Sequence, residues 1–181
     1  MEKLALATLG GGCFWCLEAV YERLNGVEQV VSGYCGGDVD QPTYQMVCTG
    51  NTGHAEAIQI TYEDSLISDQ TVIDLFFAFH DPTTLNRQGA DVGTQYRSAV
   101  FYETESQKQL ALDAIKRVTD EKWWPAPIVT DVAPLNKFFP AEDYHQQYFQ
   151  MNFSQPYCQI VISPKVEKLF KEYSHLLQKN Q

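Results

Sequence analysis

Residues 3–26 read KLALATLGGGCFWCLEAVYERLNG and join two segments of different apolar spacing through glycines. The first, residues 3–9, is short and mostly apolar, which predicts a buried strand. In the second, apolar side chains recur at three- and four-residue steps: Leu17, Val20, Tyr21 and Leu24. That spacing predicts a helix over residues 14–24, with Asn25-Gly26 as its C-terminal stop. The glycines at positions 10–12 give the backbone freedom for a sharp turn, so Cys13 is expected at the helix start.

The rest of the chain continues to alternate predicted strands and helices. Strands are expected over residues 27–34, 58–62, 96–102, 128–132 and 158–162. Three helices are expected from their start signals: Ser68 as an N-cap, Thr104 with Gln107 as a capping box, and Ser163-Pro164. Because these elements interleave without a clean βαβα repeat, the pattern predicts an α+β domain with a mixed sheet and packed helices.

The composition bounds the kind of protein. With 181 residues, of which 44% are hydrophobic, the chain can build one core, and we expect a single domain over residues 1–181. Lys and Arg number 13 against 23 Asp and Glu, a net charge of −10, which argues against a nucleic-acid partner. The longest wholly apolar run, residues 75–79, is far shorter than the roughly 18 to 20 residues of a membrane span. Because residues 4–9 are too short for a secretory signal, a cytoplasmic location is expected.

Cys13 has the most informative position among the five cysteines, whose odd number argues against a framework of structural disulfides. Unpaired N–H groups and the positive dipole end at a helix start lower the pKa of a thiol, which favours a thiolate nucleophile. Phe14 and Trp15 can form an apolar wall beside Cys13, and Cys16 is close enough for a C-x-x-C disulfide. Two other interpretations stay open: half of a zinc site, although no second C-x-x-C accompanies it, and a buried inert cysteine pair.

A carboxyl group and two phenols are the other candidate functional groups. If residues 58–62 form a strand, Glu56 heads the buried face that carries Ile58 and Ile60, and burial favours the neutral carboxylic acid that a general acid requires. The alternative is a glutamate at the strand edge that reaches water. Tyr44 and Tyr96 lie near turns marked by Pro42 and Gly93, where they are either packed core residues or hydrogen-bond donors to a polarised oxygen.

Four motifs occur in the order of a known family: GGCFW at residues 11–15, CTGNTGHAE at 48–56, GTQYRS at 93–98 and PAEDYHQ at 140–146. With these motifs the chain resembles the A type of peptide methionine sulfoxide reductase, in its GCFWC subgroup. The resemblance implies one catalytic domain, a two-layer α/β sandwich with a ferredoxin-like core and a mixed sheet. It also implies an enzyme of protein repair under oxidative stress, which acts on the S-epimer of methionine sulfoxide, free or within proteins.

The resemblance also implies roles for the candidate residues. Cys13 attacks the sulfoxide sulfur and becomes a sulfenic acid, while neutral Glu56 protonates the oxygen. The remaining pocket residues divide into a polar and an apolar side: Tyr44 and Tyr96 hold the oxygen, Asp91 belongs to the polar side, and Phe14 and Trp15 cradle the S-methyl group. No metal or bound cofactor is expected, and the molecule is expected to be a monomer.

A second thiol must then condense with the sulfenic acid, and thioredoxin, or dithiothreitol in vitro, reduces the disulfide. Cys16 is the first choice because of its proximity to Cys13. Cys158 is second, since residues 157–162 alternate like a strand and a strand cysteine moves less easily. Cys35 is third, and it replaces the small residue that the family usually has at this place. Cys48 is expected to be structural.

Three rival functions are compatible with some of these residues. A general dithiol-disulfide oxidoreductase would use Cys13 and Cys16 without Glu56. A cysteine-dependent acyl transferase would need a base, for which His54, His80 and His145 are candidates. A redox-inert binding module would capture oxidised methionine without turnover.

Overall fold

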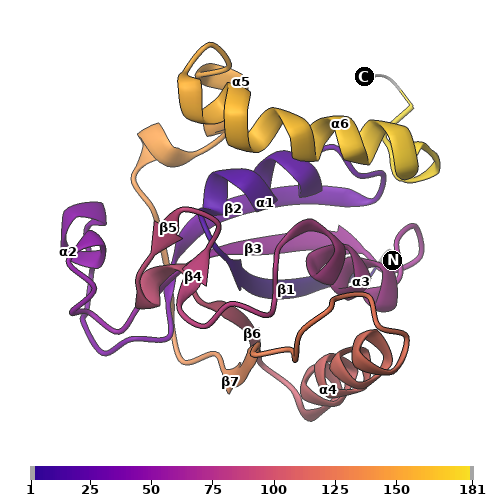
Figure 1. Ribbon diagram of the computed structural model, residues 1–181, viewed down its shortest axis with the longest axis horizontal. Coiled ribbons are helices and arrows are strands. Elements are labelled where there is room, and N and C mark those ends of the chain that lie inside the picture. The colour runs from indigo at the N-terminus through magenta and orange to yellow at the C-terminus, as the bar shows by residue number, and fades with distance from the viewer. Residues whose placement is uncertain (1–2, 180–181) are drawn as a thin grey trace.

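The computed structural model describes residues 3–179 as a mixed sheet with helices packed on it (Figure 1). The strands are β1 (Leu4–Gly11), β2 (Val27–Cys35), β3 (Ala55–Glu63), β4 (Arg87–Gln88), β5 (Asp91–Val92), β6 (Ser98–Tyr102), β7 (Asp131–Pro134) and β8 (Phe138–Pro140). The helices are α1 (Phe14–Tyr21), α2 (Tyr44–Cys48), α3 (Asp69–Phe79), α4 (Glu105–Asp120), α5 (Tyr148–Met151) and α6 (Ser163–Glu172). The ends of the domain expected over residues 1–181 lie outside the described residues.

The main sheet has the strand order β7-β6-β1-β3-β2-β8. Its neighbouring strands are antiparallel, except for the parallel pair of β6 and β7. Strands β4 and β5 form a separate small hairpin. The α+β fold with a mixed sheet that the sequence predicts is therefore confirmed. Among residues 3–179, no helix is both long enough and apolar enough to cross a membrane.

The register of β1 and β3 brings two distant parts of the chain together. These strands are antiparallel, and Leu9 lies opposite Ile58. The C-terminal end of β1 is therefore beside the N-terminal end of β3, which begins at Ala55. Since Cys13 follows β1 after a short turn, Glu56 lies next to the start of α1.

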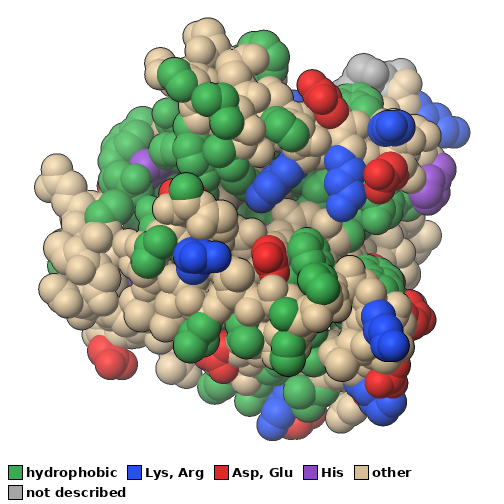
Figure 2. All heavy atoms as spheres, in the orientation of Figure 1, with side chains coloured by type: hydrophobic (Ala, Val, Ile, Leu, Met, Phe, Trp, Pro, Cys, Tyr) green, Lys and Arg blue, Asp and Glu red, His purple; other side chains and the backbone are tan. Residues whose placement is uncertain are grey.

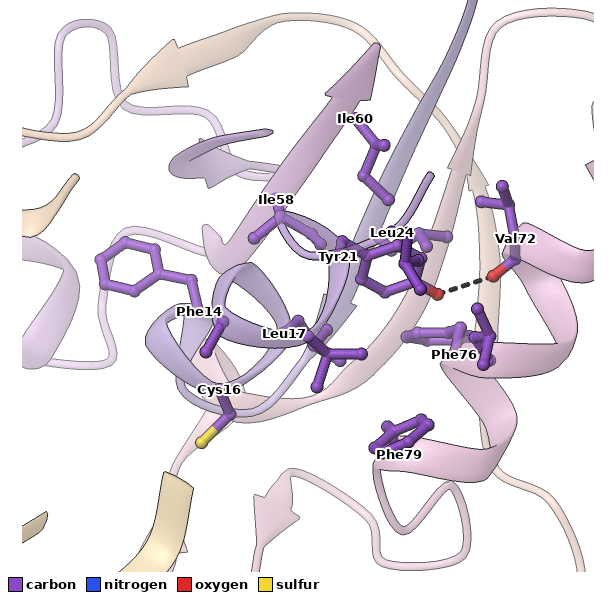
Figure 3. Packing of buried hydrophobic residues seen from close by; sticks show 14 of the residues in the cluster. Phe14, Cys16, Leu17, Tyr21, Leu24, Ile58, Ile60, Val72, Phe76 and Phe79 are labelled. Atoms are coloured by element: carbon purple, nitrogen blue, oxygen red, sulfur yellow. Dashed lines mark hydrogen bonds between the residues drawn. The ribbon is translucent and has the colours of Figure 1, made fainter. Parts of the chain in front are cut away.

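The core follows from the side-chain alternation of β3. Glu56, Ile58, Ile60 and Tyr62 are all buried, as the period of two predicts. Helix α1 lies between this sheet and α6, and α3 packs nearby (Figure 1). In Figure 3, side chains of α1 and α3 meet, and the Tyr21 hydroxyl donates to the Val72 carbonyl oxygen over 2.6 Å. The helix that carries Cys13 is therefore held firmly on the sheet.

One predicted strand is wrong. Residues 158–162 form a π-helix, Cys158–Ile162, which runs directly into α6. Cys158 and Ile162 are fully buried, whereas Ile160 between them is 73% exposed. An alternating strand would bury Ile160 with the other two, so the buried positions instead follow the four-residue spacing of a helix. The argument that a strand holds Cys158 rigidly therefore fails.

The start signals at Ser68 and Thr104 are confirmed, whereas Ser163-Pro164 lies where the helix Cys158–Ile162 already runs into α6, and several boundaries move. Ser68 Oγ accepts from the Thr71 N–H, and Thr104 with Gln107 forms the capping box. Helix α1 ends at Tyr21 rather than residue 24, and β6 begins at Ser98 because Thr94–Tyr96 is a 3-10 turn. The strand expected over residues 128–132 is displaced to β7, where pairing with β6 selects the register. Helix α2 was not expected from the sequence.

Part of the surface stays apolar. Met151, the last residue of α5, is 76% exposed, and Phe153 is 55% exposed. Figure 2 shows hydrophobic side chains gathered where α5 lies in Figure 1. This surface therefore directly precedes, along the chain, the segment that carries Cys158.

Candidate active site

Cys13 is the N-cap residue of α1, as the sequence predicts. The turn before it depends on Gly12, which has a φ of +90°. A side-chain carbon at this position would lie 2.5 Å from Gln88 Cγ of β4. The glycine is therefore required both for the left-handed backbone and for the close packing of Gln88. Cys13 keeps 7% of its surface exposed.

The two sulfurs of Cys13 and Cys16 are hydrogen bonded to each other. Burial raises the pKa of Cys13, and the neighbouring Cys16 and Glu56 add to this increase. The Trp15 N–H at the helix start does lower the pKa of Cys13, as expected, but desolvation is the larger effect and the net change is an increase. The hydrogen bond from Cys13 instead lowers the pKa of Cys16 to about 7. The pair therefore loses its first proton near neutral pH.

Glu56 is buried, with 1% of its surface exposed, so the alternative of a glutamate in water is wrong. The Phe14 N–H donates to Glu56 Oε1 over 3.2 Å, which holds the carboxyl group beside the start of α1. Burial raises the pKa of Glu56 to about 8, despite this hydrogen bond, and the charges of Asp91 and Cys16 add to the increase. Glu56 is therefore mainly a neutral acid at pH 7, as the sequence predicts.

The two phenols come from separate elements and meet near Glu56. Tyr44 begins α2, and Tyr96 ends the 3-10 turn Thr94–Tyr96. Burial raises the pKa of both tyrosines, and both interact electrostatically with Glu56. Both hydroxyls are therefore available as neutral donors, although that of Tyr44 is hydrogen bonded to the exposed Cys48.

An aromatic wall stands beside Cys13, and it is larger than the sequence predicts. Phe14 and Trp15 are joined by His145 and Tyr148. The Trp15 Nε1–H donates to His145 Nδ1 over 3.2 Å, and the Tyr148 ring lies flat on the Trp15 ring with centroids 3.6 Å apart. The indole is thus held at its edge by one residue and on its face by another.

Glu142 ties this wall to the tyrosines. Its carboxylate accepts from the Tyr34 hydroxyl over 3.0 Å, from the Tyr44 N–H over 3.1 Å and from the Tyr144 hydroxyl over 3.2 Å. The motif at residues 140–146 was recognised in the sequence, but none of its residues was given a role in sulfoxide reduction. Its density of charged and aromatic residues was the signal for this part of the site.

Asp91 and Tyr157 connect the small hairpin to the cysteines. The Tyr157 hydroxyl donates to Asp91 Oδ2 over 2.8 Å and lies 3.9 Å from Cys16 Sγ. Asp91 also interacts electrostatically with Glu56, which agrees with its expected place on the polar side. Tyr157, which the sequence analysis did not select, contacts Cys16, of which only 3% is exposed.

The remaining cysteines differ in their distance from this pair. Cys158 is buried in the same core cluster as Cys13 and Cys16, and it interacts electrostatically with Cys16. Cys35 belongs to the smaller cluster on the other face of the sheet, where burial raises its pKa to about 12. The structure therefore brings Cys16 and Cys158, but not Cys35, to the side of the sheet that holds Cys13.

The histidines are engaged in local structure. His54 Nδ1 accepts from the Gly37 N–H over 3.0 Å, and its Nε2–H donates to the Val39 carbonyl over 2.7 Å. His80 is bonded to the Phe76 carbonyl and to Ser98 Oγ, and burial lowers its pKa to about 4. Neither ring is free to act as a base for Cys13. Among residues 3–179, no group of three or more His, Cys, Asp or Glu side chains could hold a metal ion.

Comparison with known proteins gives one consistent result. The family model described as "Peptide methionine sulfoxide reductase" matches residues 5–177. The peptide methionine sulfoxide reductase MsrA of Chromobacterium violaceum is 56% identical over 178 residues, which cover 98% of this chain and 99% of that protein. The reduced form of Mxr1 from Saccharomyces cerevisiae is 35% identical with a TM-score of 0.79, over 86% of this chain and 90% of that chain. Mxr1 in complex with Trx2 matches with 25% identity and a TM-score of 0.56, over 81% of this chain and 85% of that chain.

Proposed function

The chain belongs to the peptide methionine sulfoxide reductase family, as an enzyme of the A type, and we propose that it reduces the S-epimer of methionine sulfoxide through Cys13. The substrate is methionine sulfoxide, free or within proteins, and the product is methionine. The observation that carries this proposal is the buried Glu56, whose pKa is about 8 and whose carboxyl group is bonded to the N–H of the residue after Cys13. A simple exchange of disulfides does not require such an acid.

In the first step, oxygen passes from the substrate to the enzyme. The Cys13 sulfur attacks the sulfoxide sulfur while Glu56 gives its proton to the oxygen, which makes the oxygen a better leaving group. The S–S bond formed by this attack and the S–O bond then both break as the hydroxyl passes to the Cys13 sulfur, so methionine leaves with its thioether sulfur reduced by two electrons and Cys13 becomes a sulfenic acid. The proton that leaves the Cys13 thiol passes through the neighbouring Cys16 and restores Glu56, so no net proton is consumed.

The pocket distinguishes the two ends of the sulfoxide group. Tyr44 and Tyr96 donate hydrogen bonds to the oxygen, for which the Tyr44 hydroxyl leaves Cys48, and Asp91 lies on the same polar side. Phe14 and Trp15 receive the S-methyl group. The polar side for the oxygen, the apolar wall for the methyl group and the Cys13 sulfur facing the sulfoxide sulfur are three fixed points, and only one epimer satisfies all three, which selects the S-epimer.

In the second step, Cys16 resolves the sulfenic acid. Its sulfur bonds to Cys13, the hydroxyl leaves as water, and a disulfide forms. Cys16 is favoured because it interacts directly with Cys13. Cys158 interacts with Cys16 instead, and Cys35 packs on the other face of the sheet. Thioredoxin then reduces the disulfide with its own dithiol, as the complex of Mxr1 with Trx2 suggests for a relative.

The test is intact-protein mass spectrometry after an equimolar amount of L-methionine (S)-sulfoxide, with peptide mapping of the disulfide. We expect methionine and a Cys13–Cys16 disulfide, and neither with the (R)-sulfoxide. Cys13→Ser should form no methionine. Cys16→Ser should make one methionine per chain but not cycle with thioredoxin, while Cys158→Ser should cycle.

Three outcomes would change this conclusion. Undiminished cycling by Cys16→Ser, with loss in Cys158→Ser, would make Cys158 the resolving cysteine. Reduction of protein disulfides without consumption of sulfoxide would favour a general oxidoreductase, which the lowered pKa of Cys16 also suits. Stable binding of sulfoxide without methionine formation in excess dithiothreitol would indicate a binding module.

A further inference from the structure

Glu18 is a buried carboxyl group that the chemistry above does not use. It lies in α1, with 1% of its surface exposed. Its Oε1 accepts from the Tyr148 N–H over 3.1 Å, and its Oε2 accepts from Ser32 Oγ over 3.0 Å. The Gln147 N–H is a further donor to the carboxyl group. Within residues 3–179 it forms no ion pair, so a buried acid is kept here for its hydrogen bonds alone.

The two backbone donors to Glu18, Gln147 and Tyr148, belong to a strained turn. Gln147 has a φ of +53°, in the left-handed region that costs a residue with a side chain on the order of 1 kcal/mol. The next residue, Tyr148, carries the ring that lies on Trp15 at an interplanar angle of 6°. Helix α1 thus holds this turn twice, through the carboxyl group of Glu18 on its backbone and through Trp15 on the ring.

The chain just before the turn is fixed independently. The Ser32 N–H donates to Gln146 Oε1 over 2.9 Å, and Gln146 Nε2 donates to the carbonyl oxygens of Ser32 and Ala141 over 2.9 and 3.1 Å. Loss of the Glu18 side chain therefore leaves Gln146 in place. Only the backbone of Gln147 and Tyr148 loses its hydrogen bonds to Glu18.

We infer that Glu18 is a positioning residue of this reductase, which fixes the turn at Gln147 and so holds Tyr148 against Trp15. The inference rests on the proposed function, because the Trp15 ring is the wall that receives the S-methyl group. Glu18 touches neither substrate nor Cys13. Burial raises the pKa of Glu18 to about 7, and both its neutral and ionised forms present an oxygen to the backbone N–H groups. The turn therefore requires the length of the Glu18 side chain, which brings its oxygen to the backbone N–H groups, rather than its charge.

Two substitutions separate reach from charge. Glu18→Asp keeps the charge but withdraws the oxygens by one methylene, and Glu18→Gln keeps the oxygen in place without the charge. With methionine sulfoxide and dithiothreitol, we expect Glu18→Asp to raise KM by about tenfold, as a loosened apolar contact does, with little change in kcat. Glu18→Gln should stay within about twofold of the parent KM. Ser32→Ala is the matched control, since it removes the other partner of Glu18 and leaves the turn bonded, and it should also stay within about twofold.

A double-mutant cycle shows whether Glu18 acts through the stacked ring. In a Tyr148→Ala background, Glu18→Asp should change KM by less than about twofold, because the ring that it positions is already absent. An equal change of KM in both backgrounds would overturn the inference, as would parent-like kinetics of Glu18→Asp.

A second readout does not require activity. The Trp15 contribution to fluorescence is the parent spectrum minus that of Trp15→Phe, and it reports the stacked ring directly. Glu18→Asp should change this contribution, and Glu18→Gln should not. If the parent protein reduced no methionine sulfoxide, the proposed function would be wrong. The Trp15 fluorescence would still show whether Glu18 positions the stacked ring. An unchanged Trp15 contribution in Glu18→Asp would contradict the positioning role.

Discussion

At the scale of single residues, one physical effect acts on Glu56 and Cys13 with opposite consequences. Burial disfavours a negative charge on either group, so it raises the pKa of both. For Glu56 this produces the neutral acid that protonation of the sulfoxide needs. For Cys13 it works against the thiolate, while the interaction with Cys13 lowers the pKa of the neighbouring Cys16 to about 7.

Glu56→Gln should slow methionine formation in a single turnover by about 10²- to 10⁴-fold, because it removes the general acid and keeps the shape of the side chain. The parent rate should fall as pH rises through about 8, where Glu56 loses its proton, and the variant should lack this fall. Rapid-quench assays from neutral to alkaline pH measure both. A variant as fast as its parent at neutral pH would remove Glu56 from the mechanism.

At the scale of elements, the turn between β1 and α1 is set by a contact from a different part of the chain. Gln88 of β4 covers Gly12, and its amide is held in place by both the N–H and the carbonyl of Asp81, each over 2.9 Å. Gln88 therefore cannot move aside for a side chain. The small β4–β5 hairpin both closes over the turn and supplies Asp91.

Gly12→Ala should lower the free energy of unfolding by about 1–3 kcal/mol, through a strained φ of +90° and a collision with Gln88, and should displace Cys13. Gly89→Ala is the matched control. Gly89 also has a positive φ, of +57°, but nothing lies within 4 Å of the added carbon, so backbone strain alone should cost about 1 kcal/mol. Urea unfolding of both variants measures the difference, and equal losses would show that the Gln88 contact is unimportant.

At the scale of the whole molecule, the active site is assembled from segments far apart in the chain. Helix α1 supplies both the thiols and the aromatic wall, β3 supplies Glu56, and residues 142–148 close the site. The burial that keeps Glu56 neutral also lowers the stability of the folded state above about pH 4.5, because Glu56 in the unfolded chain ionises at its ordinary pKa of 4.5. The stability contributed by neutral Glu56 is complete below that pH and is lost as pH rises to about 8.

Glu56→Gln should therefore become more stable relative to the parent as pH rises from about 5 to about 8, since an amide has no proton to lose. Thermal unfolding of the two proteins over this range measures the difference in Tm, which isolates Glu56 from other titrating groups. A difference in Tm that is constant with pH would show that Glu56 is not held neutral by burial in solution.

Local sequence patterns were sufficient to predict several structural features of this reductase. The helix that starts at Cys13, the capping box at Thr104 and the alternating face below Glu56 depend on a few neighbouring residues, so the sequence alone determined them. Tertiary packing decided the rest. The pKa of Cys13 depends on its burial, and Cys158–Ile162 is helical because long-range packing buries every fourth residue. Tyr148 meets Glu18 and Trp15 of α1 across more than a hundred residues, and no local sequence pattern predicts such contacts.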